Sequence, residues 1–176
     1  MVIVIYLGRR GAGKTTTMVK DAYIEYMRGR RVISNMESLT FGEYMSNEDI
    51  VKINKQSDIE NAVLLIDEMQ IFFDSRRSMK KSNLDFSNFV QQTRKRNIDI
   101  YGTTQFSNAV EKRVRDHTDI TVRPQFLKNY NLFKVIYYDE TAKEDLFFTE
   151  AVKREIVFEP KQVFNLFDTN EKIVVK

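Results

Sequence analysis

The chain has 176 residues and a formal net charge of +3, from 28 basic and 25 acidic side chains. This length predicts one domain that buries about 70% of its unfolded surface. The absence of cysteine excludes disulfides and thiolate chemistry, and the single histidine, His117, argues against a histidine-built metal site. No apolar run reaches the ~18 residues that cross a bilayer, so we expect a soluble, cytoplasmic protein.

Residues 8–15 read G-x-x-x-x-G-K-T and directly follow the apolar run 2–7. This is the strand, loop and helix start of a phosphate-binding P-loop, in which glycines let backbone N–H groups approach phosphate oxygens. Lys14 is expected to reach the β- and γ-phosphates, and the Thr15 hydroxyl to ligate Mg²⁺. The candidate nucleotide-binding residues are Gly8, Arg9, Arg10, Gly11, Ala12, Gly13, Lys14, Thr15 and Thr16.

The pattern behind the loop alternates between helices and strands. Met18, Ala22 and Tyr26 recur at helical spacing, which predicts a helix that Gly29 ends. Residues 30–35 predict a short strand, and residues 47–54 predict a helix that Ser46 caps. The run 62–66 is apolar throughout, as in a parallel strand that is buried on both faces.

That buried strand ends in the acidic pair Asp67-Glu68. A P-loop needs a carboxylate from a neighbouring strand to hold Mg²⁺, and Asp67 fits this role. Glu68 is suited to orient or deprotonate a water that attacks the γ-phosphate, which favours hydrolysis over transfer to a small substrate. The alternative is a surface turn with two acidic residues after a core strand.

Basic residues concentrate after the acidic pair. Residues 74–97 hold seven basic and two acidic side chains, a net charge of +5, so the rest of the chain is slightly acidic. Ligands of open α/β sheets collect at the carboxyl ends of the strands, so this segment predicts contact with a phosphate backbone. A solvated loop remains the alternative. The candidate DNA-binding residues are Arg76, Arg77, Lys80 and Lys81.

Residues 84–96 predict an amphipathic helix that Asn97 ends. Its last turn carries Arg94, Lys95 and Arg96, which either complement the helix dipole or supply an arginine finger to a neighbouring subunit. Arg113 and Arg115 compete for the role of finger.

Residues 98–105 predict a further strand that ends in Gln105. If this strand neighbours the strand of the acidic pair, the Gln105 amide is placed to hold the attacking water or to sense the γ-phosphate. The alternative is a polar strand end without a catalytic role.

The last third of the chain is rich in strand patterns. Residues 132–139 and 144–149 predict two strands, and residues 155–159 a third, which we expect to extend the sheet in antiparallel fashion. We expect the phenylalanines of this region to fill the core or a subunit interface: Phe126, Phe133, Phe147, Phe148, Phe158, Phe164 and Phe167.

Together these segments resemble the FtsK/HerA superfamily of ring ATPases, and within it the zonula occludens toxin-like and viral DNA-packaging branch. The resemblance rests on GRRGAGKTT, GRRVISN, AVLLIDEMQIFF, TRKRNIDIYGTTQ and VRDHTD, and extends to a terminal FNLFDT. It implies that Lys14 and Thr15 bind the phosphates and Mg²⁺, that Asp67 ligates the metal, that Glu68 is the base, and that Gln105 is the sensor. Arg94 or Arg96 would act in trans.

The resemblance implies a single RecA-like α/β P-loop domain with a mainly parallel sheet, divided into a nucleotide-binding core at 1–125 and a β-rich extension at 126–176. The implied activity is Mg²⁺-dependent ATP hydrolysis that moves double-stranded viral or plasmid DNA, in a homohexameric ring. A capsid or membrane-associated partner is left open. The alternatives are a morphogenesis or protein-remodelling ATPase that does not act on DNA, and a small nucleoside or nucleotide kinase.

Overall fold

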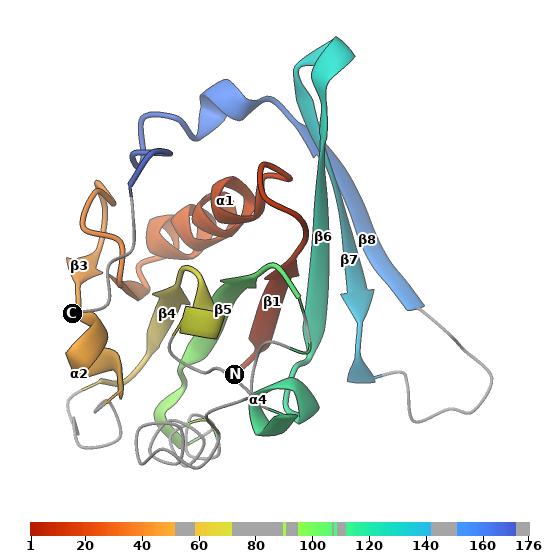
Figure 1. Ribbon diagram of the computed structural model, residues 1–176. Helices are drawn as coiled ribbons and strands as arrows, with labels where there is room; N and C mark the ends of the chain where they lie inside the picture. The colour runs from red at the N-terminus through yellow and green to blue at the C-terminus, as the bar shows by residue number, and fades with distance from the viewer. Residues whose placement is uncertain are drawn as a thin grey trace.

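The computed structural model describes residues 1–51, 59–71, 90, 95–106, 108, 112–141 and 151–171. These residues form one sheet with helices against both of its faces (Figure 1). No helix among them is long and apolar enough to span a membrane. The strands are β1 Ile3–Leu7, β2 Arg31–Ser34, β3 Glu43–Tyr44, β4 Ala62–Ile66, β5 Asp99–Thr104, β6 Ile120–Leu127, β7 Leu132–Asp139 and β8 Ala151–Phe158; the helices are α1 Lys14–Met27, α2 Asn47–Val51 and α4 Lys112–Asp116.

The strands follow the order β3-β2-β4-β5-β1-β6-β7-β8. The neighbours from β3 to β6 pair in parallel, and β7 and β8 add antiparallel pairs at one edge. This arrangement confirms the predicted RecA-like α/β fold, with a mainly parallel sheet and an antiparallel C-terminal extension. β5 lies between β1, which leads into the P-loop, and β4, which ends at the acidic pair.

The central strands are buried on both faces, which explains their continuous apolar sequence. On one face, Val4, Val63 and Leu65 pack against Met18 and Val19 of α1. On the other face, a different set of strand residues packs against Ile50 of α2 and Val114 of α4: Ile3, Leu64, Ile66 and Ile100. Because the strands from β3 to β6 are parallel, their carboxyl ends lie together at one end of the sheet.

Arg30 connects the C-terminal end of α1 to the amino-terminal ends of β4 and β5. Its guanidinium forms ion pairs with Glu25 and Asp99 and donates to the carbonyl oxygens of Ala62 and Asn97 at 3.0 and 3.3 Å. Asn97 has a left-handed φ of 51°, in agreement with its predicted role in ending a helix. The cluster fixes where β4 and β5 begin.

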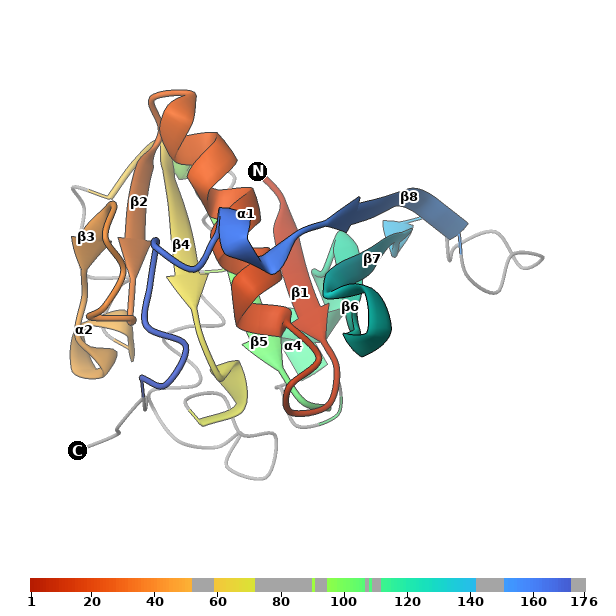
Figure 2. The same ribbon diagram turned by 90° about the horizontal axis from the view of Figure 1, so that it is seen from above.

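The segment after β8 crosses over α1 and returns to the side of β2 and β3 (Figure 2). Thr40 N–H donates to the Leu166 carbonyl at 2.8 Å, which fixes the crossing segment to the loop after β2. The residues of this segment therefore lie beside α1, although they are far from it in the sequence.

Several elements of the structure differ from those that the sequence predicted. The strand predicted at 155–159 is longer and begins earlier, at Ala151, and it pairs with β7. The sequence did not predict β3 or β6, and the division expected between residues 125 and 126 falls within β6. The strand predicted at 144–149 lies outside the described residues, as does most of the helix predicted at 84–96, of which Val90, Lys95 and Arg96 are helical.

Candidate nucleotide-binding site

The P-loop connects β1 to α1 with two glycines in left-handed conformations. Gly11 has a φ of 77° and Gly13 a φ of 94°, and residues other than glycine rarely adopt such values. A Cβ atom on Gly13 would lie 2.2 Å from Cε1 of Phe133 in β7. The loop therefore packs directly on the antiparallel extension, and position 13 has no room for a side chain.

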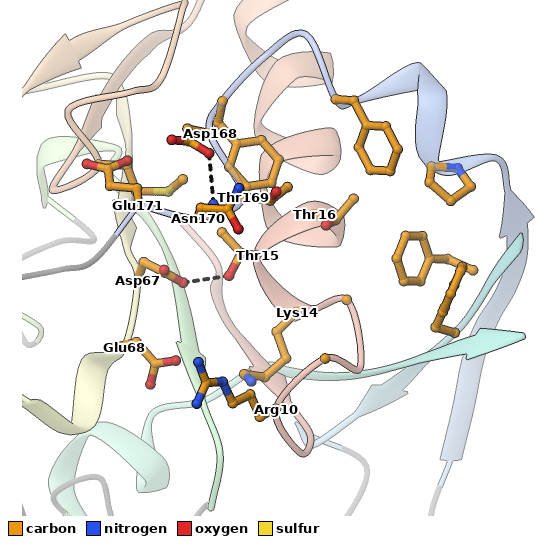
Figure 3. Close-up of a pocket in the computed structure, with 18 of the residues that line it drawn as sticks. Arg10, Lys14, Thr15, Thr16, Asp67, Glu68, Asp168, Thr169, Asn170 and Glu171 are labelled. Atoms are coloured by element: carbon orange, nitrogen blue, oxygen red, sulfur yellow. Dashed lines mark hydrogen bonds between the residues drawn. The ribbon is translucent and has the colours of Figure 1, made fainter. Parts of the chain in front are cut away.

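Lys14 and Thr15 begin α1 on the floor of a cavity (Figure 3). Lys14 is buried, and its Nζ lies 3.4 Å from the Arg9 carbonyl oxygen across the loop. The Thr15 hydroxyl donates to Oδ1 of Asp67 at 2.9 Å. The P-loop and the end of β4 thus meet, as the sequence predicted.

Asp67 is buried within a set of hydrogen bonds that fixes its position. Thr103 of β5 donates its hydroxyl to Oδ1 of Asp67 at 2.7 Å. The Asn35 side chain forms two hydrogen bonds with the backbone of Asp67. Asp67 N–H donates to Oδ1 of Asn35 at 2.8 Å, and Nδ2 of Asn35 donates to the Asp67 carbonyl oxygen at 3.1 Å. Burial raises the pKa of Asp67, while the hydrogen bonds from Thr103 and Thr15 oppose that rise.

Glu68 turns away from Asp67 because its backbone is left-handed, with a φ of 55°. Its N–H donates to the Thr103 hydroxyl at 2.9 Å, so one threonine contacts both acidic residues. Gln70 donates from Nε2 to the Glu68 carboxylate. Sequence reasoning missed Asn35, Thr103 and Gln70; only the polar strand end in TTQ and the Gln in DEMQ gave a signal.

One cavity of about 950 Å³ contains most of the predicted site. Lys14, Thr15, Asp67, Glu68 and Gln105 all line it. Its other walls come from the P-loop, α1, the loop after β2, the turn after β4, β6, β7 and the C-terminal segment: Arg10, Gly11, Gly13, Thr16, Met36, Ile71, Phe126, Phe133, Pro160, Phe164, Phe167, Asp168, Thr169, Asn170 and Glu171. Because β4 and β5 are neighbours, Gln105 lies at the same edge as the acidic pair, as predicted.

Of the candidate arginine fingers, Arg96 and Arg115 do not line this cavity. Arg96 accepts a backbone hydrogen bond from Asn61 just before β4, and Arg115 lies in α4 just before β6. Both positions are at the amino-terminal ends of the parallel strands, opposite the P-loop (Figure 1). The side chain of Arg113 and the residues Arg94, Arg76, Arg77, Lys80 and Lys81 lie outside the described part of the chain.

The arrangement of Thr15 and Asp67 fits the binding of Mg²⁺ together with a nucleoside triphosphate. Mg²⁺ keeps several waters and takes one or two protein oxygens along with phosphate oxygens. The Thr15 hydroxyl and the Asp67 carboxylate converge on one side of the cavity and are oxygen donors of this kind. The described residues contain no group of three or more histidine or acidic side chains for a metal, and this mode of binding needs none.

The fold is similar to that of several solved structures. The N-terminal domain of zonular occludens toxin from Neisseria meningitidis superposes with a TM-score of 0.66 at 18% identity, over 95% of this chain and 98% of that one. The genome packaging NTPase B204 of Sulfolobus turreted icosahedral virus 2, in complex with AMPPCP, gives 0.58 at 13% identity, over 90% and 97%. The pCW3 conjugation coupling protein TcpA with ATPγS gives 0.63 at 9% identity, over 93% and 62%.

Sequence comparison gives the family. No curated protein matched the chain at a significant level. The family described as zonular occludens toxin (Zot) matches residues 42–172, which is well over half of the chain and includes the acidic pair, β5, the antiparallel strands and the C-terminal segment. This chain belongs to the zonular occludens toxin (Zot) family.

Proposed function

We propose that the protein is a Mg²⁺-dependent ATPase that couples hydrolysis to the movement of double-stranded DNA. The observation that carries the proposal is the hydrogen bond between Thr15 and Asp67, which brings the P-loop and the acidic strand end together in one cavity with Glu68. This is the arrangement that holds the phosphates of a nucleotide beside a group able to activate water.

Each residue of the site has a distinct part in the proposed reaction. The P-loop N–H groups and Lys14 hold the phosphates, while Thr15 and Asp67 would hold Mg²⁺, which when bound neutralises charge on the phosphate oxygens. Glu68 takes a proton from the attacking water, and Gln105 orients that water or responds to the γ-phosphate. Thr103 keeps the two acidic residues in register, since its hydroxyl contacts both.

Two further observations support DNA as the partner. The segment 74–97 follows the acidic pair directly and has a net charge of +5, in a chain whose total is +3. Among proteins of the same fold, one is described as a genome packaging NTPase and another as a conjugation coupling protein. We propose that Arg76, Arg77, Lys80 and Lys81 contact the DNA backbone and that the protein acts in the cytoplasm as a homohexameric ring.

The test is the rate of ATP hydrolysis with and without duplex DNA of unrelated sequences, at salt concentrations from ~50 mM upward. We expect stimulation that does not depend on sequence and that falls steeply with salt, because phosphate contacts release counterions. Replacing Arg76, Arg77, Lys80 and Lys81 together by serine should abolish stimulation and keep basal hydrolysis. A matched control replaces Lys128, Lys134, Lys153 and Lys161, which lie elsewhere on the fold, by serine.

Two results would redirect the proposal. ATP hydrolysis that duplex DNA neither binds nor stimulates at ~50 mM salt would favour an ATPase that remodels a protein partner. Absence of hydrolysis by the wild-type protein with ATP and Mg²⁺, in the presence and absence of DNA, would contradict the proposed enzyme itself.

A further inference from the structure

The cavity continues beyond the phosphate-binding residues along an apolar wall. This part is lined by Phe126 and Phe133 of β6 and β7 and by Pro160, Phe164 and Phe167 of the C-terminal segment. The rings of Phe126 and Phe133 lie 5.0 Å apart. Figure 3 shows rings from these two parts of the chain beyond Thr16, on the side of the cavity away from Glu68.

Phe164 differs from its neighbours on this wall. Val163 is 1% exposed and Phe167 is 6% exposed, and both belong to the core that packs on α1. Phe164 lies between them but is 53% exposed, although it lines the cavity. A large aromatic side chain left open in a cavity, with buried residues on either side, provides a face for another flat group.

The backbone that carries Phe164 is anchored on both sides. Val163 N–H donates to the Pro160 carbonyl at 3.0 Å, and Leu166 N–H donates to the Val163 carbonyl at 2.9 Å. Further along, the Glu171 carboxylate accepts from the N–H groups of Glu37 and Ser38 at 2.7 and 3.2 Å. The segment is therefore fixed across the cavity by contacts that do not involve Phe164 itself.

We infer that this apolar wall is the nucleobase subsite and that the base of the nucleotide stacks on Phe164. The inference rests on the proposed function, since the P-loop must fix the triphosphate at the other end of the cavity. The volume of about 950 Å³ is in the range of small-molecule sites. A nucleoside triphosphate held at Lys14 and Thr15 places its base in the remaining part, and the aromatic wall is the part of the cavity suited to a flat ring.

The wall also predicts weak discrimination between bases. Phe126, Phe133, Pro160, Phe164 and Phe167 have no side-chain hydrogen-bonding group, so they contact the face of a base and do not read its edge. Binding energy at this subsite is then shared by adenine and guanine. ATP and GTP should bind with affinities within about tenfold of each other, because neither gains a side-chain partner from the wall.

The first experiment compares ATP, GTP and inorganic tripolyphosphate as ligands of the wild-type protein and Phe164→Ala, by calorimetry with Mg²⁺. Phe164→Ala should weaken ATP and GTP binding by about tenfold, as expected for the loss of one stacked aromatic ring, and leave tripolyphosphate binding unchanged. Phe164→Tyr should restore nucleotide affinity, since it keeps the ring. Tyr130→Ala is the matched control, because Tyr130 is 74% exposed and lies outside the cavity.

A second experiment uses the absence of tryptophan from the sequence. Phe164→Trp introduces a single indole at the proposed subsite, and Tyr130→Trp introduces one elsewhere. ATP should quench the fluorescence of the first variant and not of the second, and tripolyphosphate should quench neither.

The outcomes separate this inference from the proposed function. If the wild-type protein binds ATP but Phe164→Ala binds it equally well, or weakens ATP and tripolyphosphate equally, the base does not stack on Phe164 and the inference is overturned. If the wild-type protein binds neither ATP nor tripolyphosphate, the proposed function itself fails. Because Phe164 is half exposed, its variants should fold, which an unchanged melting temperature verifies.

Discussion

At the scale of single residues, the site depends on a few side chains with defined contacts. Lys14 faces the cavity from the P-loop, and Glu68 faces it from the end of β4, with its carboxylate held by Gln70. The two residues differ in what they would do for a nucleotide, since one binds phosphate and the other acts on water. Their substitution should therefore separate binding from turnover.

We expect Lys14→Ala to weaken ATP binding by roughly 30-fold or more, because the negative phosphates would be left without their buried partner. Glu68→Gln should keep ATP binding and lower turnover by about 10²–10⁴, because only the base is removed. Equilibrium binding and steady-state hydrolysis measure the two effects. Lys128→Ala and Glu60→Gln, both at exposed positions, are controls, and equal turnover by Glu68→Gln and the wild type would remove Glu68 from the mechanism.

Thr103 is a positioning residue under both acidic groups. Thr103→Val keeps the shape but removes a donor to Asp67 and an acceptor for the Glu68 N–H, at a cost of about 1–3 kcal/mol in stability. Turnover should fall more than ATP affinity, and Thr103→Ser should restore it. Thr118→Val, which loses one hydrogen bond at the far end of α4, should cost stability without lowering turnover. Equal losses of turnover in both valine variants would show that Thr103 has only a structural role.

At the scale of secondary-structure elements, the contact between α1 and the sheet decides the position of the P-loop. Asp21 of α1 accepts hydrogen bonds from the hydroxyls of Tyr6 in β1 and Tyr137 in β7, each at 2.9 Å to Oδ2. One partly buried carboxylate thus joins the helix behind the P-loop to both the parallel and the antiparallel parts of the sheet. Burial raises the pKa of Asp21, partly offset by the two tyrosine hydroxyls.

This raised pKa predicts how stability depends on pH. Between the unfolded and folded pKa values, the unfolded chain ionises first, so the contribution of Asp21 to folding falls as pH rises and is lowest above the folded pKa. Asp21→Asn keeps an acceptor and removes the charge, so its advantage in unfolding free energy over the wild type should grow as pH rises above about 4. Urea unfolding at several pH values measures this.

Asp21→Ala provides the comparison. It leaves two tyrosine hydroxyls without their acceptor and should destabilise the protein by about 1–3 kcal/mol at every pH. A difference between Asp21→Asn and the wild type that stays constant with pH would contradict the argument from ionisation.

At the scale of the whole molecule, the two described candidate fingers, Arg96 and Arg115, and the P-loop lie at opposite ends of the parallel strands. Arg96 and Arg115 are near the starts of β5 and β6, whereas the cavity lies at the carboxyl ends. If one of them completes a catalytic site, it must do so in a neighbouring subunit. The sequence alone allowed these arginines to act in their own subunit or in a neighbouring one, whereas this geometry favours action in trans.

We expect Arg96→Ala or Arg115→Ala to be inactive alone and to regain hydrolysis when mixed with Glu68→Gln, because a mixed interface pairs an intact finger with an intact base. Arg94→Ala is tested in the same way. A mixture of Lys14→Ala and Glu68→Gln is the control, since no site in it has both residues and activity should not return. Full wild-type activity at concentrations where light scattering detects only monomers would contradict trans action.

The sequence by itself determined the parts of the protein that depend on local patterns. The P-loop spacing, the apolar strands around it and the acidic pair predicted β1, α1, β2 and β4 close to their observed bounds. Parallel strands have their carboxyl ends at the same end of the sheet, and this general rule predicted that Lys14, Thr15, Asp67 and Gln105 lie close together. All four line one cavity. These predictions succeeded because each depends on a short segment whose chemistry allows few conformations.

The strand β6 was missed for a local reason. Its alternation of buried Val122 and Pro124 with exposed Arg123 and Gln125 is typical of a strand, but proline within a run argues against one. Pro124 is accommodated here within an antiparallel pair with β7. Only the presence of β1 and β7 on either side decided that this segment is a strand.

Only the tertiary structure decided what surrounds the nucleotide site. Asn35 forms hydrogen bonds with Asp67, which is 32 positions away in the sequence, and Phe133 of β7 packs against Gly13 of the P-loop. Phe164 was expected to fill the core or a subunit interface; it is not part of the core but lies open in the cavity, while Val163 and Phe167 are buried. Such contacts join residues far apart in the chain, so they follow from the order of the strands in the sheet and from how the C-terminal segment crosses α1, and from no local pattern.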